Sequence, residues 1–163
     1  MGLKGVVKGL ADQAYEALAS GMSGSRCMTG AIMVASADKG TVYFKQTANY
    51  TGTPEDAQPH HVENALMAAL FTWTQTVLKT PFVLPANSIV YIYVYYSPCK
   101  LCTENLAPFR SMRRTWTANN PTVTWKLAWS VYFVGRKNGY DDSDKANTAY
   151  GTHLGHFHSI RQI

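Results

Sequence analysis

The sequence of 163 residues has no long apolar run, few cysteines and few charges, and each shortage excludes a class of protein. No stretch of eighteen apolar residues is present, which argues against a membrane-spanning helix, and the N-terminus lacks the charged-then-apolar pattern of a signal peptide. Three cysteines cannot form a disulfide framework, so a reducing compartment is favoured. Charged residues make up only 15% while 46% are hydrophobic, which excludes long-range disorder.

The length fits one compact domain with a single core, since no internal repeat and no candidate linker divides the chain. We expect this domain to span residues 1–163, with residues 1–5 and about 145–163 at its periphery. The formal net charge of +5 favours a polyanionic partner but does not require one.

Hydrophobic periodicity predicts helices that alternate with strands. Apolar residues recur at helical steps over residues 6–19 and again from Val62 to about Lys79. Apolar and β-branched runs predict strands at 28–36, 41–45, 88–96 and 123–134, the last as one long strand or as two with a bend. Loops are expected at 47–59 and 135–144, and a short helix plus a tail in the last twenty residues. This order predicts an α/β sandwich with a mixed sheet.

Two places in the chain share a pattern typical of a metal site. His61 and Glu63 are expected in the first turn of the helix that follows the loop, and Cys99 and Cys102 follow the buried strand 88–96 at another helix start. Zinc accepts imidazole nitrogen and thiolate sulfur, and three protein ligands leave a fourth position for water. We therefore expect His61, Cys99 and Cys102 as ligands. Glu63 is placed to carry the protons of that water.

Alternative interpretations of the histidines remain open. A closed zinc site could merely link two helices, with a fourth ligand from His60 or from the tail, although such a site would give Glu63 no purpose. Adjacent helical positions point about 100° apart, so His60 and His61 cannot both ligate from one regular turn, and the H-x-E offset selects His61. His60 is expected beside the ligands or the substrate. A second metal could bind the tail histidines, but an exposed tail is favoured for His153, His156 and His158.

His61-Val62-Glu63 and Ser97-Pro98-Cys99-x-x-Cys102 match the H-x-E and P-C-x-x-C signature of zinc-dependent nucleobase deaminases. On these motifs the chain resembles the cytidine-deaminase-like superfamily, specifically the AID/APOBEC mutators and the deaminase domains of bacterial polymorphic toxins. The resemblance implies an α/β/α sandwich with a mixed sheet of about five strands. It also implies a zinc hydrolase acting on a C–N bond of an amidine, converting cytosine to uracil or, less often, adenine to hypoxanthine in a polynucleotide.

The same resemblance implies contacts with the substrate. An asparagine about a dozen residues before the zinc histidine contacts the nucleotide sugar in that family, and Asn49 occupies a similar place. Tyr96 stands where an aromatic residue packs on the flipped base, and the loop from Arg136 to Tyr140 would select the neighbouring base. Roles in turns and strand ends remain open for these residues. The candidate substrate-binding residues are Asn49, His60, Tyr96, Ser97, Arg136 and Tyr140.

The expected function is therefore Zn2+-dependent deamination of cytosine in single-stranded DNA by a bacterial toxin domain. The alternatives are an RNA or tRNA adenosine or cytosine deaminase, a double-stranded DNA cytosine deaminase, a free-nucleoside deaminase, and a non-catalytic zinc-stapled module that binds nucleic acid. The expected partners are the polynucleotide and a cognate immunity protein, with no membrane. The expected site of action is the cytoplasm, including that of a target cell into which a larger toxin delivers the domain.

Overall fold

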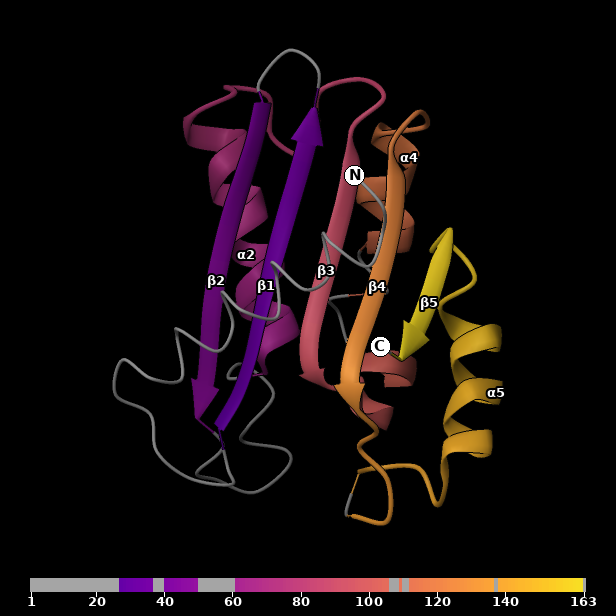
Figure 1. Ribbon diagram of the computed structural model, residues 1–163. Coiled ribbons are helices and arrows are strands. Elements are labelled where there is room, and N and C mark those ends of the chain that lie inside the picture. Colours follow the sequence, from indigo (N-terminus) through magenta and orange to yellow (C-terminus); the bar gives the residue numbers. More distant parts are fainter. Residues whose placement is uncertain are drawn as a thin grey trace.

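The computed structural model describes residues 27–36, 40–49, 61–105, 109, 112–136 and 138–162 (Figure 1). Its strands are β1 (Cys27–Ser36), β2 (Gly40–Asn49), β3 (Ile89–Tyr96), β4 (Thr124–Val131) and β5 (Ser159–Gln162). Its helices are α2 (Val62–Thr76), the short α4 (Thr117–Asn119) and α5 (Ser143–His153), with π-helical turns η2 (Leu101–Asn105) and η3 (Met112–Trp116). The helix expected over residues 6–19 lies outside the described residues. Within the described ranges, no helix has the length and apolar character needed to cross a membrane.

The strands form one mixed sheet in the order β2-β1-β3-β4-β5. β1 pairs antiparallel with both β2 and β3, whereas the β3–β4 and β4–β5 pairs are parallel. Parallel neighbours need a crossover connection, which the segment from η2 to α4 provides for β4 and which α5 provides for β5. The mixed α/β fold predicted from the sequence is confirmed. Four of its strands have eight to ten residues, and the fifth is an edge strand of four.

The hairpin of β1 and β2 is longer than the sequence predicted. Residues 47–49 were expected in a loop, but they belong to β2, where they pair with residues 27–29 of β1. The loop prediction was wrong here because residues such as Thr47 and Asn49 are held in a strand by pairing with β1, which a local pattern does not reveal.

The strands in the second half of the sheet differ from those predicted. The segment 123–134 forms a single strand that ends at Val131, and beyond it Val134 makes only an isolated bridge to Tyr140. The fifth strand comes instead from the tail, which was expected to follow a short helix without regular structure. That helix exists as α5, but β5 was missed because its four residues carry no period of their own.

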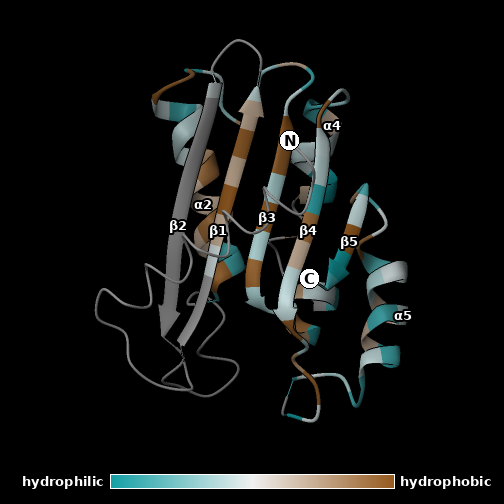
Figure 2. Ribbon diagram, in the orientation of Figure 1, coloured by the Kyte–Doolittle hydropathy of each residue, from teal (hydrophilic) through white to brown (hydrophobic). Residues whose placement is uncertain are grey.

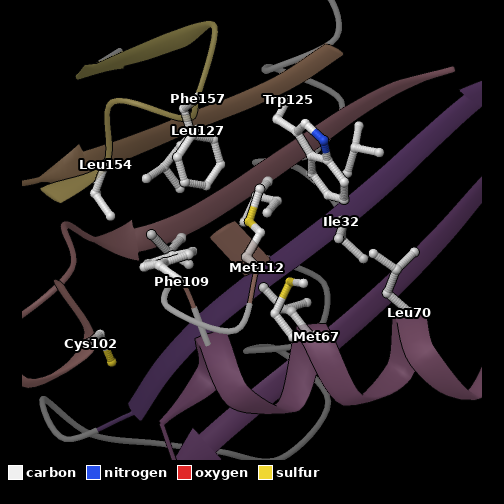
Figure 3. Close-up of a cluster of buried hydrophobic side chains, with 14 of the residues drawn as sticks. Ile32, Met67, Leu70, Cys102, Phe109, Met112, Trp125, Leu127, Leu154 and Phe157 are labelled. Atoms are coloured by element: carbon white, nitrogen blue, oxygen red, sulfur yellow. The ribbon is translucent and has the colours of Figure 1, made fainter. Parts of the chain in front are cut away.

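The core lies mainly between the sheet and the helices on one of its faces (Figure 1). Apolar residues of α2 recur every three or four positions and turn one stripe towards the sheet. Figure 3 shows the resulting cluster, which includes Met67 and Leu70 of α2 with Ile32, Phe109, Met112, Trp125 and Leu127. Alternate strand residues point to the opposite face, where a second buried cluster consists of Ala31, Met33, Tyr91, Tyr93 and Ala128. In Figure 2 β3 alternates between hydrophobic and paler segments, because its tyrosines score as mildly hydrophilic, yet five consecutive residues of this strand are buried, as the run in β3 predicted.

Gly30 of β1 allows the start of α2 to approach the sheet closely. A Cβ atom at this position would lie 2.9 Å from both Leu66 Cδ1 and Tyr93 O, and 3.2 Å from Val62 Cγ2. The Tyr93 carbonyl is held in the sheet and cannot move aside. A side chain at position 30 would therefore force α2 to move away from β1. Gly30 therefore sets the distance between β1 and the first turns of α2.

We predict that Gly30→Ala destabilises the protein by about 1–3 kcal/mol, the usual range for overpacking. The free energy of unfolding, measured in urea, tests this. Gly151→Ala is the matched control, because a Cβ atom there would have no neighbour within 4 Å. That control should be neutral or stabilising by roughly 0.5–1 kcal/mol, since alanine favours a helix interior. Equal effects of the two substitutions would contradict the role assigned to Gly30.

Candidate metal centre

Two segments of the chain meet at the C-terminal end of β3. His61 directly precedes α2 with extended backbone angles of φ −65° and ψ 137°. It is therefore the N-cap residue of the helix, whereas the sequence had predicted a position in the first turn. Residues 97–99 leave the end of β3, which is parallel to β4. In sheets of this kind ligands gather beyond the C-terminal ends of the parallel strands. The structure brings His61, Cys99 and Cys102 together there.

The three side chains have the geometry of a zinc site. Their ligand atoms all lie within 4.8 Å of one another. His61 Nδ1 lies 3.0 Å from Cys102 Sγ and 3.6 Å from Cys99 Sγ. Tetrahedral coordination with Zn–S bonds of ~2.3 Å and a Zn–N bond of ~2.0–2.1 Å needs N···S distances of roughly 3.5 Å. One imidazole and two thiols at this spacing therefore fit the metal that the sequence predicted.

The electrostatics of the centre favour one thiolate. A hydrogen bond from the Cys102 thiol, together with one from His61, lowers the pKa of Cys99 below its usual value. The same bond to Cys99, with burial, raises the pKa of Cys102. The hydrogen bond with Cys99 also raises the pKa of His61. Zinc binds cysteine as the thiolate, so the centre already holds one sulfur in the form that a metal requires.

Glu63 is a buried carboxyl group beside these ligands. It lies in the first turn of α2, its side chain is only 1% exposed, and neither of its carboxyl oxygens has a hydrogen-bond partner within the part of the chain that the structure describes. Burial, followed by the negative charge of Cys99, raises its pKa to about 7, while its own backbone N–H and the charge of His61 act in the opposite direction. A carboxyl group with this pKa exchanges a proton readily near neutral pH.

The segment that carries Cys102 is wound differently from the regular helix that was predicted. Leu101–Asn105 forms the π-helical turn η2, although the Thr103 N–H still donates to Cys99 O at 3.0 Å in the manner of an α-helix. The helix start predicted at Cys99 and Cys102 is therefore wound as a π-helical turn over Leu101–Asn105 and not as a regular α-helix. Single π-helical turns occur frequently at functional sites.

Ser97 anchors the turn before the cysteines. Its side chain, predicted to contact substrate, is 1% exposed, and its Oγ accepts a hydrogen bond from the Phe133 N–H at 2.9 Å. Its own N–H donates to Val131 O at 2.8 Å. These bonds tie the turn to the chain that leaves β4, which favours a structural role for the Ser97 side chain.

Tyr96 and Arg136 lie together at the accessible edge of this region. The Arg136 guanidinium carbon is 5.9 Å from the centre of the Tyr96 ring, a distance typical of a cation–π contact. Phe133 completes the group, with its ring centre 6.0 Å from that of Tyr96. Arg136 is exposed and Tyr96 is partly buried. The structure therefore places these two predicted substrate residues side by side.

The other predicted substrate residues are placed differently. Tyr140 is only 5% exposed, and its hydroxyl donates to Glu104 Oε1 at 2.8 Å. Burial and this hydrogen bond raise the pKa of Tyr140 above its usual range. These contacts favour a packing role over the predicted stacking on a base. Asn49 ends β2, but its side chain is not among the described parts of the structure, and His60 lies outside the described residues.

The tail histidines do not gather into a second metal site within the described residues, where His61, Cys99 and Cys102 form the one cluster of metal-binding side chains. His158 Nδ1 instead accepts a hydrogen bond from the Trp125 N–H at 3.0 Å. His156 packs against Phe157, and burial lowers its pKa to about 4, so the ring is neutral near pH 7. His153 is exposed at the end of α5.

Phe133 and Tyr150 were not among the predicted site residues. Tyr150 of α5 is buried, and its hydroxyl donates to Pro98 O at 2.7 Å, directly before Cys99. The sequence did hold a signal for it, because Ala146, Tyr150 and Leu154 recur every four residues and all three are buried. No local pattern indicated which residue they would face.

Comparisons with known proteins support the fold. No protein-family model and no curated protein sequence matches the chain. It is similar to the crystal structure of a C-terminal deletion mutant of Aspergillus oryzae Rib2 deaminase in complex with DARIPP, with a TM-score of 0.54 and 14% identity over 94% of this chain and 82% of that chain. A second structure of this mutant gives a TM-score of 0.52 and 13% identity over 97% and 83% of the two chains. The chain therefore has the fold of these deaminases.

We predict that the purified protein binds one zinc ion and that His61→Ala and Cys102→Ser each abolish stoichiometric binding. Each substitution removes one of three ligands, and two ligands do not hold zinc against a chelator. Metal content after dialysis, measured by inductively coupled plasma mass spectrometry, checks this. Cys27→Ser is the control, since it removes a thiol outside the predicted ligand set and should retain the metal. Full zinc content in Cys102→Ser would contradict the assignment.

Proposed function

We propose that the protein is a zinc-dependent deaminase that converts cytosine to uracil in single-stranded DNA. The observation that carries the proposal is the position of Glu63, a buried carboxyl group beside one imidazole and two thiols at zinc-binding distances. A zinc site that only linked two segments would have no use for a carboxyl group held there at the cost of burial. The fold shared with Rib2 deaminases supports the same reaction class.

The reaction divides between the metal and the chain. His61, Cys99 and Cys102 would hold the zinc, which would supply a bound water with a pKa lowered towards 7 as the nucleophile. Glu63 accepts a proton from the water and delivers it to the ring nitrogen of the base. It then assists proton transfer to the amino group, so that cytosine and water become uracil and ammonia.

The polynucleotide substrate is supported by the group of Tyr96, Phe133 and Arg136 beside the centre. Aromatic rings stack on unpaired bases of any sequence, and an exposed arginine can neutralise a phosphate. The formal net charge of +5 acts in the same direction. Single-stranded DNA is preferred over duplex DNA because an unpaired base reaches a buried centre without the cost of unpairing.

A second candidate is deamination of a free nucleoside or another small molecule. The complex of Rib2 deaminase with DARIPP supports a search among ligands other than polynucleotides, because that chain has the same fold. Other substrates of the same chemistry are cytosine or adenine in RNA or tRNA and cytosine in duplex DNA. A non-catalytic module that binds nucleic acid around a zinc ion is the alternative outside enzymes.

The proposed biological setting is a toxin domain that acts in the cytoplasm of a target cell and is neutralised by a cognate immunity protein. The resemblance of the two motifs to bacterial polymorphic toxins supports this setting. Uncontrolled conversion of cytosine to uracil in a genome would account for toxicity.

We predict that Glu63→Gln retains zinc but loses activity by about 10²–10⁴-fold, the range for removal of a general acid or base. Ammonia release and sequencing of the treated oligonucleotide measure the loss, and cells expressing the variant should grow where wild-type cells are arrested. Asp144→Asn is the matched control, because Asp144 also lies in the first turn of a helix but is exposed. It should keep wild-type activity. A Glu63→Gln protein as active as wild type would contradict the proposed chemistry.

We predict that single-stranded DNA is deaminated faster than duplex DNA, RNA, free cytidine or adenosine, in parallel assays of C-to-U and A-to-I conversion. Arg136→Gln should weaken DNA binding. It should also reduce the slope of log affinity against log salt concentration by about one, the change expected when one phosphate contact is lost. Arg114→Gln is the control, since Arg114 is likewise exposed but belongs to η3 and not to the loop that carries Arg136. Equal rates on duplex and single-stranded DNA would contradict the preferred substrate.

A further inference from the structure

The hydroxyl of Tyr150 reaches from α5 to the turn that carries Cys99. It donates a hydrogen bond to Pro98 O at 2.7 Å, although the two residues are 52 positions apart in sequence. Pro98 and Cys99 share a peptide unit, so the orientation of this carbonyl also sets the direction in which the chain enters Cys99. The contact therefore acts on the backbone of a predicted metal ligand.

The backbone at Pro98 has one soft dihedral angle. The proline ring fixes φ, which leaves ψ to determine where the Pro98 carbonyl and the following Cys99 point. A hydrogen bond to that carbonyl restrains ψ. Other anchors hold the neighbouring residues, since Ser97 Oγ accepts from the Phe133 N–H and the Lys100 N–H donates to Asn138 O at 2.8 Å. Tyr150 supplies the anchor between them.

The ring of Tyr150 is fixed independently of its hydroxyl group. The side chain is 1% exposed, and its ring centre lies 5.0 Å from that of Trp129 and 5.7 Å from that of Tyr140, both in edge-to-face contacts. Aromatic packing of this kind restrains both side-chain angles of a tyrosine. The hydroxyl is therefore presented to Pro98 from a rigid position, and its removal need not disturb the ring.

We propose that Tyr150 is a positioning residue for the metal centre, holding Cys99 in the orientation that binds the metal through its hydrogen bond to Pro98 O. This inference rests on the proposed function in one respect, namely that His61, Cys99 and Cys102 hold the metal. It adds a requirement that the two motifs do not contain, because a residue of the C-terminal helix completes the site.

The test compares Tyr150→Phe with Tyr132→Phe in the full-length zinc-loaded protein. Both substitutions remove one tyrosine hydroxyl, but the Tyr132 hydroxyl donates to Asn147 Oδ1 at the exposed surface. Loss of a contact that orients a metal ligand usually costs 10–100-fold in metal affinity. We expect Tyr150→Phe to transfer zinc to a chromogenic chelator at least tenfold faster than wild type, and Tyr132→Phe to match wild type.

Unfolding of the metal-free and metal-loaded forms separates positioning from a merely structural role. Positioning predicts that Tyr150→Phe lowers the stability of the loaded protein more than that of the metal-free protein, because the difference between the two losses is the change in metal binding. Equal losses in the two forms, or zinc release at the wild-type rate, would overturn the inference. Cobalt(II) substitution gives a second measurement, since the thiolate absorption should change in Tyr150→Phe alone. Ammonia release is read separately, so an inactive wild type that still shows these differences would overturn the deaminase proposal and leave the positioning role supported.

Discussion

The structure depends on four ionisable side chains that are kept together where α2 begins and β3 ends. Glu63, Cys99 and Cys102 are buried in a largely apolar interior and His61 is partly buried, so burial of these groups costs solvation free energy. The packing of α2 against β1 and β2 must offset this cost, and at Gly30 of β1 the helix comes so close that a Cβ atom would lie 2.9 Å from Leu66 Cδ1. The site and the core are therefore one energetic unit.

The sequence predicted the parts of this unit that are determined locally. The offset from His61 to Glu63 and the spacing of Cys99 and Cys102 are short-range features of the sequence. The apolar run of β3 also predicted a buried strand, and Cys99 follows the C-terminal end of that strand. Even here the sequence did not predict the winding of the segment that carries Cys102, because the π-helical turn η2 stands where a regular α-helix was expected. A period of 3.6 cannot reveal a turn that departs from it.

What the sequence could not predict comes from contacts between distant residues. β5 has no period of its own and becomes a strand only because β4 offers an edge with which to pair. The bond from Tyr150 to Pro98 joins α5 to the turn after β3, and no spacing in the chain encodes it. Burial of Tyr140 likewise depends on Glu104 and on neighbouring aromatic rings. In each case tertiary context, and not propensity, decides the role of the residue.

The groups proposed for the chemistry and the groups proposed for substrate recognition differ in burial. The groups proposed to perform the chemistry are buried and held by several elements, so their geometry tolerates little change. The groups proposed to meet the substrate, Tyr96 and Arg136, are more accessible and touch each other through a cation–π contact. A contact of that kind at an exposed site contributes only about 0.5–1 kcal/mol, so a phosphate or a base can displace it at little cost. Tyr140, in contrast, is packed in the core, so within the loop from Arg136 to Tyr140 the residue that remains accessible for the proposed substrate contact is Arg136, and a substitution there need not disturb the metal centre.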